Sequence, residues 1–267
     1  MILQQYKPSP RLQPYIQEYY LLEGNLGGRI NDVFFADGCL EIVFNLELDF
    51  YRDGEKENWS KVIGQIKEPL HIQAEGKGKS FGIWFTPQGF SKLTGQPAYE
   101  LTDNAISLDN LFDSSFIESI GDLLLTDDIQ SVINHLNIHF EKALNASEMT
   151  RKDKILNYAV QCISNQSSDL PLADISDSCG VSIRYLQKIF QNQIGLSPKA
   201  FQKITRFQRV LQRLNENSRY SLTQVGYEAG YADQSHFIRD FKAFSGVVPS
   251  QYSAQNQPIG QYFMHYR

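Results

Sequence analysis

Residues 180–201 read GVSIRYLQKIFQNQIGLSPKAF, and residues 230–252 repeat much of this pattern as GYADQSHFIRDFKAFSGVVPSQY. Six positions recur 51 residues apart with the same or a similar side chain: Leu186 and Phe237, Lys188 and Arg239, Phe190 and Phe241, Gly195 and Gly246, Pro198 and Pro249, Phe201 and Tyr252. Four more recur 50 residues apart just upstream: Leu172 and Leu222, Ile175 and Val225, Ser176 and Gly226, Gly180 and Gly230. A unit that occurs twice in this form predicts two helix-turn-helix modules in tandem.

The repeated small residues have a structural reason in such a module. The two helices cross at close range, so the first helix needs a small side chain at the crossing, and the turn needs a residue that accepts a positive φ angle. Ser176 and Gly180 meet both needs in the first unit. Gly226 and Gly230 meet them in the second.

The second helix of each unit carries side chains that suit DNA. The residues expected to face the core are Ile183, Leu186 and Phe190 in the first unit and Phe237 and Phe241 in the second. The outward residues are then Arg184, Gln187 and Lys188 in the first unit and Gln234, Ser235 and Arg239 in the second. Arg and Lys can donate to guanine, Gln can pair with adenine, and Ser suits either role. One such helix alone would fit a solvated surface equally well, but two matched units favour base reading.

A connecting helix is predicted between the two units. Gly195 ends the preceding helix, and Ser197 followed by Pro198 is a favourable helix start that leads to a helix reaching about Asn215. Its roughly 18 residues would span about 27 Å, enough to hold two recognition helices roughly 34 Å apart in successive major grooves. Its basic residues are expected to contact DNA phosphate or to form structural ion pairs: Lys203, Arg206, Arg209 and Arg213.

Charge divides the chain into an acidic and a basic part. The formal net charge is −5, yet residues 151–267 contain 14 of the 25 Lys and Arg and only 8 of the 30 Asp and Glu. The C-terminal part therefore carries +6 and residues 1–150 carry −11. A basic module beside an acidic partner domain is typical of proteins that bind nucleic acid.

The N-terminal half has a β-like pattern. Between residues 15 and 86, aromatic and β-branched runs alternate with Gly-rich or charged turns: YIQEYYLLE, NDVFFAD, CLEIVFNLELDFY, WSKVIGQI, LHIQAE and KSFGIWF. These runs predict an antiparallel sandwich or small barrel. Two stretches with helical spacing follow Pro87. The expected fold class is α+β, with an N-terminal antiparallel β barrel or sandwich with helices, then an all-α part in which a linker helix joins two helix-turn-helix units.

The expected domain boundary is the polar segment NASEMTRKD, residues 145–153. We expect a β-rich sensor or dimerisation domain at residues 1–147, a DNA-binding domain at residues 148–255 and a tail at residues 256–267. The first helix of the DNA-binding domain is expected from about Arg151 to Ser164.

Metal, disulfide and membrane classes fit the sequence poorly. Cys39, Cys162 and Cys179 are odd in number without CxxC spacing, so neither a disulfide framework nor a zinc site is indicated. His135 and His139 have i, i+4 spacing but no evident third ligand, so we expect no metal and no other cofactor. No apolar run is long enough to span a membrane, and the N-terminus lacks a signal-peptide pattern, so a cytoplasmic protein is expected.

The quoted C-terminal segments resemble the DNA-binding domain of AraC/XylS-type bacterial transcription regulators over about 100 residues. In that family the second helix of each unit enters the major groove, which implies base-edge roles for the six outward residues named above. The departures from the family pattern are Ser176 and Gly226 in place of alanines, Val210 in place of a connector alanine, and Ser253 where an Arg often follows the final Tyr. The resemblance implies double-stranded DNA and RNA polymerase as partners, and we expect an activator.

The N-terminal segments YKPSPRLQPYIQEYY, ADGCLEIVFNL and FGIWFTPQGFSKLTG resemble the β-rich region of some members of this family. There a cupin-like barrel binds a small effector and adjoining helices form a homodimer. The side chains that are candidates for lining an effector cavity are Phe34, Phe44 and Trp84, with Trp59 and Phe85. Plain core packing is the alternative interpretation of these aromatic residues.

Three classes of function therefore remain open. The leading one is a sequence-specific DNA-binding transcription regulator with a sensing or dimerising N-terminal domain. The second is an effector-independent DNA-binding protein whose N-terminal half is only an oligomerisation scaffold. The third is a cupin-like enzyme with an accessory DNA-binding domain, but no paired carboxylate, nucleophile motif, metal triad or phosphate loop supports it, so we expect no enzyme.

Overall fold

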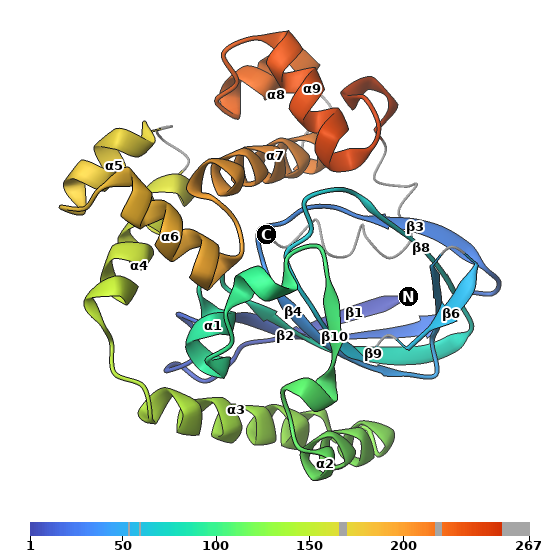
Figure 1. Cartoon of the computed structure of the whole chain (residues 1–267). Helices are drawn as coiled ribbons and strands as arrows, with labels where there is room; N and C mark the ends of the chain where they lie inside the picture. Colours follow the sequence, from blue (N-terminus) through green and yellow to red (C-terminus); the bar gives the residue numbers. More distant parts are fainter. Residues whose placement is uncertain (53, 59, 166–169, 217–220, 253–267) are drawn as a thin grey trace.

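The computed structural model describes residues 1–52, 54–58, 60–165, 170–216 and 221–252. Two facing sheets make up most of the N-terminal part, and helices make up the C-terminal part (Figure 1). The predicted α+β class is confirmed.

The sheets are antiparallel throughout the described residues. Sheet A has the strand order β1 (Ile2–Tyr6), β2 (Ile16–Asn25), β9 (Lys77–Phe85), β4 (Glu41–Leu46), β7 (Lys61–Ile63) and β10 (Ala105–Ser107). Sheet B has the order β3 (Ile30–Phe34), β8 (Leu70–Glu75), β5 (Asp49–Arg52) and β6 (Glu55–Glu57). Strands β1, β6 and β10 lie outside the runs that predicted the sheet, and β6 falls in a charged segment that the sequence pattern had indicated as a turn.

One predicted run, CLEIVFNLELDFY, divides between the two sheets. Its first part forms β4 in sheet A and its second part forms β5 in sheet B. The chain turns at Glu47, whose φ angle is +67°, a conformation that breaks the regular strand. This turn helps to fold the two sheets over one another.

The two faces of sheet A pack against different neighbours. The cross-strand row of Tyr19, Ile83 and Ile42 faces the helices that follow the sheet. The next row, with Trp84 and Glu41 side by side, faces sheet B and the barrel interior. Alternation along each strand produces this division.

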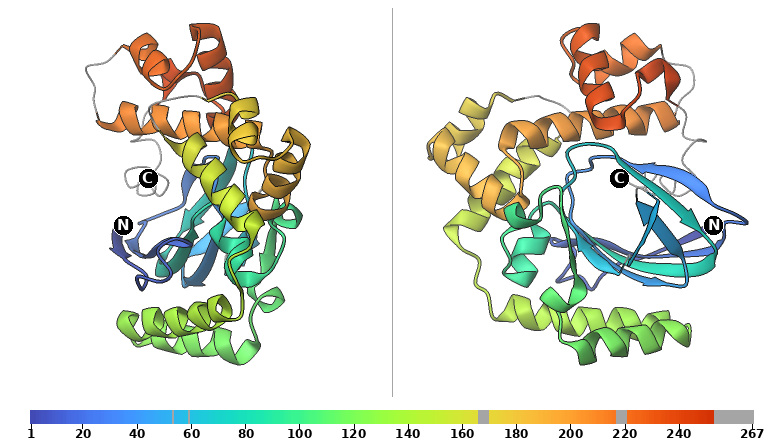
Figure 2. Two further views of the ribbon diagram at one scale, coloured as in Figure 1. Left: turned by 90° about the vertical axis from the view of Figure 1, so that its left-hand side faces the viewer. Right: turned by 45° about the vertical axis from the view of Figure 1, so that its right-hand side comes forward.

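Short and long helices cover the outer face of sheet A. They are α1 (Gly89–Thr94), the 3₁₀ helix η1 (Ala98–Leu101), η2 (Leu108–Asn110), α2 (Ser114–Leu125) and α3 (Ile129–Asn145). Helices α2 and α3 lie side by side along one side of the barrel in both figures (Figures 1 and 2). The side chain of Asp128 accepts a hydrogen bond from the Ser131 amide and so caps α3.

The C-terminal part consists of α4 (Arg151–Ser164), α5 (Leu172–Ser178), α6 (Ile183–Ile194), α7 (Pro198–Glu216), α8 (Leu222–Glu228), α9 (Gln234–Ser245) and the short η3 (Pro249–Gln251). The bounds of α4 match the predicted ones, and Ser197 accepts a hydrogen bond from the Ala200 amide at the start of α7. The expected tail at residues 256–267, and Ser253, lie outside the described residues.

A loop of the barrel joins the sheets to the C-terminal helices. Phe35 lies beyond the end of β3, and its ring packs 5.9 Å from that of Phe207 on α7. The next residue, Ala36, is fully buried against the first helix-turn-helix unit and accepts a hydrogen bond of 2.5 Å from the Gln208 side chain. The same loop therefore contacts the cores of both units.

Candidate nucleic-acid interface

The first helix-turn-helix unit consists of α5 and α6. Ser176 at the crossing is 2% exposed, and Gly180 in the turn has a φ angle of +63°, as the pattern predicted. Leu186 and Phe190 of α6 are fully buried. The prediction for Ile183 is wrong, because this side chain is 42% exposed at the start of the helix, where it precedes the turn that packs on the core.

The second unit consists of α8 and α9. A Cβ atom on Gly226 would lie 3.1 Å from the Phe237 ring, so the two helices are tightly packed at this crossing. Gly230 in the turn has a φ angle of +92°. The carboxylate of Asp233 accepts a hydrogen bond of 2.8 Å from the His236 amide and so begins α9.

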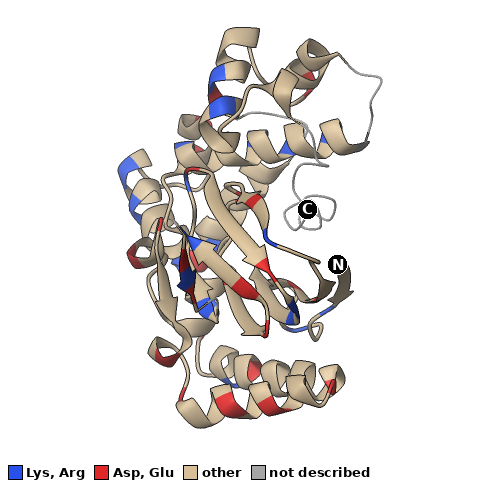
Figure 3. Ribbon diagram, turned by 90° about the vertical axis from the view of Figure 1, so that its right-hand side faces the viewer, with Lys and Arg blue, Asp and Glu red and all other residues tan. Residues whose placement is uncertain are grey.

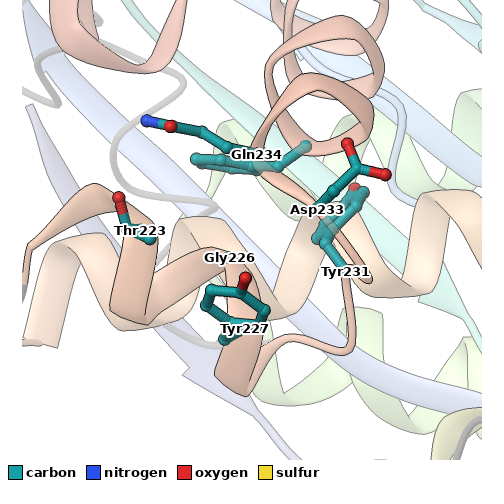
Figure 4. A pocket seen from close by; sticks show the side chains of 7 residues that line it. Thr223, Gly226, Tyr227, Tyr231, Asp233 and Gln234 are labelled. Carbon is teal, nitrogen blue, oxygen red and sulfur yellow. The ribbon is translucent and has the colours of Figure 1, made fainter.

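The surface at the α8–α9 crossing includes two residues that the sequence did not identify as candidates for binding DNA. Thr223 and Tyr227 extend from α8 on the side where Gln234 leaves the start of α9 (Figure 4). Tyr227 is 61% exposed. No repeat signal marks these positions, since the first unit has Ala173 and Asp177 there.

All six side chains that the sequence predicted to point outward are exposed: Arg184, Gln187 and Lys188 on α6, and Gln234, Ser235 and Arg239 on α9. They lie on the faces of these two helices opposite the buried residues. Their contact with DNA bases stays a prediction.

The basic residues of α7 have partners inside the protein. The Lys203 ammonium lies 3.0 Å from the carboxylate of Asp240, which is 4% exposed. Arg206 places its guanidinium 5.0 Å from the centre of the Tyr231 ring. These contacts tie α7 to the second unit.

Two further arginines of α7 also make internal contacts. Arg209 donates to the carbonyl groups of Ile163 and Asn165 at the end of α4, at 2.7 and 3.0 Å. Arg213 forms an ion pair with Glu228 of α8. Lys203, Arg206, Arg209 and Arg213 thus all make contacts inside the protein. Phosphate contact by the first three stays a prediction.

The aromatic candidates of the N-terminal half do not line one cavity. Phe34 and Trp84 belong to the core between the two sheets. Phe44 and Phe85 lie on the opposite face of sheet A, packed against the helices, because alternate residues of a strand point to opposite faces. The expectation of a shared cavity is therefore corrected, and Trp59 lies outside the described residues.

A partly buried carboxyl group, that of Glu41, lies among the residues that face sheet B. The Tyr20 hydroxyl donates a hydrogen bond to Glu41, and the absence of a side chain on Gly82 makes room for the tyrosine ring. Burial raises the pKa of Glu41 to about 7, although hydrogen bonds from Tyr20 and Trp84 oppose the rise. Burial also raises the pKa of the neighbouring Cys39 thiol to about 12, so this cysteine is not activated as a nucleophile.

Gln65, in the loop after β7, was not identified from the sequence. The residue is fully buried, and neither its amide nitrogen nor its amide oxygen has a hydrogen-bond partner among the described residues. Such a group is costly to bury unless something satisfies it.

Comparison with known proteins agrees with this geometry. Residues 175–255 match a family described as a helix-turn-helix domain, and residues 4–107 match a domain of unknown function (DUF6597). The Msm operon regulatory protein of Streptococcus mutans is 26% identical over 147 residues, which cover 55% of this chain and 52% of that protein. The arabinose operon regulatory protein of Escherichia coli is 26% identical over 126 residues, which cover 46% and 43%. The C-terminal part is a helix-turn-helix domain, similar to those of AraC-type operon regulators.

The chain spans about half the length of these two curated relatives. Both are named as operon regulators and neither as an enzyme. A solved structure of apo ToxT from Vibrio cholerae aligns with 88% of this chain and 96% of its own, with a TM-score of 0.46 and 16% identity.

The C-terminal part, residues 151–267, carries 14 of the 25 Lys and Arg. Figure 3 shows Lys and Arg on the C-terminal helices, whereas acidic residues gather on the pair α2 and α3 at the other end of the molecule. This distribution follows the division of charge along the sequence. Phosphate groups would be attracted to the end that holds α6 to α9.

The remaining candidates for chemistry are structural in the described residues. His139 packs with its ring centre 4.6 Å from that of Phe116, and burial lowers its pKa. No group of three or more His, Cys, Asp or Glu within the described ranges could hold a metal ion. In the same ranges, no helix has both the length and the apolar character needed to cross a membrane.

Proposed function

We propose that this protein is a sequence-specific regulator of transcription that binds double-stranded DNA through α6 and α9. The observation that carries the proposal is the pair of helix-turn-helix units on α7, each with an exposed polar face on its second helix. At 19 residues, α7 is about 28 Å long, close to the roughly 34 Å between successive major grooves. The proposed place of action is the cytoplasm.

The two units would read different bases. Arg184 of the first unit corresponds to Ser235 of the second, whereas Lys188 and Arg239 both keep a basic side chain. A guanine would suit each of these two basic residues, and the other positions would differ between the half-sites. A single chain would therefore favour an asymmetric bipartite operator.

The test begins by selecting a binding sequence for the full chain from a pool of random duplexes. Lys188→Ala and Arg239→Ala should each lose about 1 to 3 kcal/mol of discrimination against non-selected DNA, because each removes a base contact. The matched control is Lys142→Ala, which removes an exposed lysine from α3, far along the chain from both units. Equal affinity of the double variant and the parent would refute the base-reading roles.

We infer further that the N-terminal domain binds a small effector and that this protein acts as an activator, with RNA polymerase as a partner. The partly buried Glu41 and the fully buried Gln65, which has no partner among the described residues, support an effector with hydrogen-bonding groups over a purely structural scaffold, since an unsatisfied buried polar group costs stability. A screen of small metabolites for a rise in melting temperature of the full chain tests this part, because a ligand that binds only the folded state must stabilise it. The absence of any stabilising compound with hydrogen-bonding groups would favour the scaffold.

The exposed side of α2 and α3 is the proposed surface for a homodimer. Leu125 and Ile138 are 62% and 70% exposed on these helices. Sedimentation of the full chain tests for a dimer, and substitution of Ile138 by Glu should shift the equilibrium to monomer. A monomeric parent chain at high concentration would remove this part of the proposal.

A further inference from the structure

A surface hollow lies where the first recognition helix meets the N-terminal domain. Its volume is about 630 Å³, and its lining includes Tyr99 of η1, Lys152 near the start of α4, and Tyr185, Lys188 and Asn192 of α6. We refer to it as the η1–α6 hollow. Lys188 thus belongs both to this hollow and to the face that is proposed to read DNA.

The walls of the η1–α6 hollow are held together by direct contacts between the domains. The Thr102 hydroxyl, just after η1, donates a hydrogen bond of 2.8 Å to the carbonyl of Gly195 at the end of α6. A side chain on Gly195 would lie 2.9 Å from the Ala98 carbonyl oxygen, so η1 and α6 are in close contact. The hollow therefore exists before any ligand arrives.

The start of helix α4 is held against the N-terminal domain by α1. The Lys92 ammonium, from α1, lies 3.0 Å from the carboxylate of Asp153 and donates to the Glu148 carbonyl at 2.7 Å. Next to Asp153, Lys152 donates a hydrogen bond of 3.0 Å to the Asn192 side chain. Lys152 is thereby held over α6 with its positive charge directed at the hollow.

The chemistry of the lining suits a phosphate group. Two ammonium groups, two phenol rings and two carboxamides provide positive charge and hydrogen-bond donors around a partly apolar floor. Within the described residues, neither Lys152 nor Lys188 forms an ion pair with a carboxylate, and Asp153, next to Lys152, is paired with Lys92. Glu100, next to Tyr99 and hydrogen-bonded to its hydroxyl, is an exposed acidic residue that opposes an anion here.

The position of the hollow, beside the outward face of α6, indicates which molecule would supply the phosphate. On α6, Arg184, Lys188 and Gln191 succeed one another at helical spacing, so the outward face runs along the helix into the hollow. When a recognition helix lies in the major groove, the flanking surface of the protein meets the DNA backbone at the groove's edge. We propose that the η1–α6 hollow binds a phosphate of the DNA backbone, so that Tyr99 brings the N-terminal domain into the DNA interface.

This inference rests on the proposed DNA binding and is tested with the full chain. The probe is a mixed-sequence duplex of about 40 base pairs, because a phosphate contact is independent of sequence. The affinity of the parent and of variants is measured as a function of salt concentration. Lys152→Ala should lower the slope of log K against log salt by about 0.9 and weaken binding several-fold, about eightfold at most at roughly 0.1 M salt.

Two gentler variants and a control sharpen the experiment. Glu100→Gln should tighten binding about two- to fivefold, because it removes a negative charge near the phosphate. Tyr99→Phe should weaken binding less than Lys152→Ala does, because the Tyr99 hydroxyl hydrogen-bonds with Glu100 and must turn from it to reach the phosphate. Lys154→Ala removes an exposed lysine two residues from Lys152 on another side of α4 and should leave the slope unchanged. Melting temperatures show whether each variant is folded.

The outcomes separate the two proposals. If the parent binds no duplex, the proposed function fails. If the parent binds but Lys152→Ala, Glu100→Gln and Tyr99→Phe behave like the Lys154→Ala control, the function stands and this inference is overturned. It is also overturned if pyrophosphate raises the melting temperature of the parent and not of Lys152→Ala while the DNA slopes agree, since the hollow would then hold a small phosphate compound.

Discussion

Single side chains in this protein have roles that their chemical type alone does not reveal. Lys203 belongs to a basic series along α7 that suggests DNA phosphate, yet it lies 3.0 Å from the buried Asp240. His236 also approaches this carboxylate, at 3.1 Å. The sequence could not reveal the Lys203–Asp240 ion pair. Asp240 corresponds to the apolar Ile189 in the first unit, so the repeat does not mark this position as one for a buried carboxylate.

We expect Lys203→Ala to lower the free energy of unfolding by about 1 to 3 kcal/mol, because it leaves Asp240 buried with a weaker partner. The value is below that of a fully buried pair, since the Lys203 side chain is 35% exposed. Urea unfolding measures the change, with Lys199→Ala as the control for an exposed lysine of the same helix. A stable Lys203→Ala variant with a reduced salt slope in DNA binding would instead assign Lys203 to phosphate.

Glu41 makes the stability of the barrel depend on pH. Its pKa rises from 4.5 to about 7 on folding, so the folded state binds the proton more tightly than the unfolded chain does. Its contribution to stability is present below pH 4.5 and is lost as the pH rises toward 7. Relative to the parent, Glu41→Gln should therefore gain stability across this interval, by at most about 3 kcal/mol.

The measurement compares urea unfolding of parent and Glu41→Gln at pH 5 and pH 8. The exposed Glu55→Gln is the matched control and should follow the parent at both values. A constant difference between parent and Glu41→Gln across this range would show that Glu41 is ionised throughout.

At the level of elements, helix ends were more predictable than packing. Residues Arg151–Ser164 and the start of α7 at Pro198 were predicted correctly, because caps, glycines and prolines act through neighbouring backbone groups. The packing of the two faces of sheet A was not predicted. Alternation along the strands places Phe44 and Trp84 on opposite faces, but it does not show which face the helices cover. The turn at Glu47 likewise lacks the glycine that usually marks a positive φ angle.

The crossing of α8 and α9 gives a prediction at this scale. Gly226→Val should lower the free energy of unfolding of the second unit by about 1 to 3 kcal/mol, because the added side chain overlaps the Phe237 ring, 3.1 Å from a Cβ atom. Ser176→Ala at the equivalent crossing of the first unit serves as the comparison and should be close to neutral, since alanine is smaller than serine. Hydrogen exchange of the α9 amides reports the loss, and unchanged exchange would mean that α8 and α9 can separate at no cost.

At the scale of the whole molecule, the loop after β3 connects the barrel to both helix-turn-helix units. Phe34 and Phe35 are neighbours in the chain but face different cores, the barrel interior and the second helix-turn-helix unit. Ala36 then reaches the core of the first unit and accepts its hydrogen bond from Gln208, 172 residues away in sequence. Contacts over this separation leave no local pattern, which is why the sequence predicted two domains but not how they join.

This arrangement predicts that Phe35→Ala loosens both units from the barrel. The large side chain is 9% exposed, so its loss should cost about 3 to 5 kcal/mol of contacts that hold the domains together. Limited proteolysis between α3 and α4, at residues 146–150, should become faster, because separation of the domains exposes this connection. Phe34→Ala is the matched control: it weakens the barrel core but leaves the interdomain contacts in place. If both variants are cleaved at the same rate, the loop does not hold the domains together, and the contacts of α1 and η1 with the C-terminal helices, such as Lys92 with Asp153 and Thr102 with Gly195, hold them together instead.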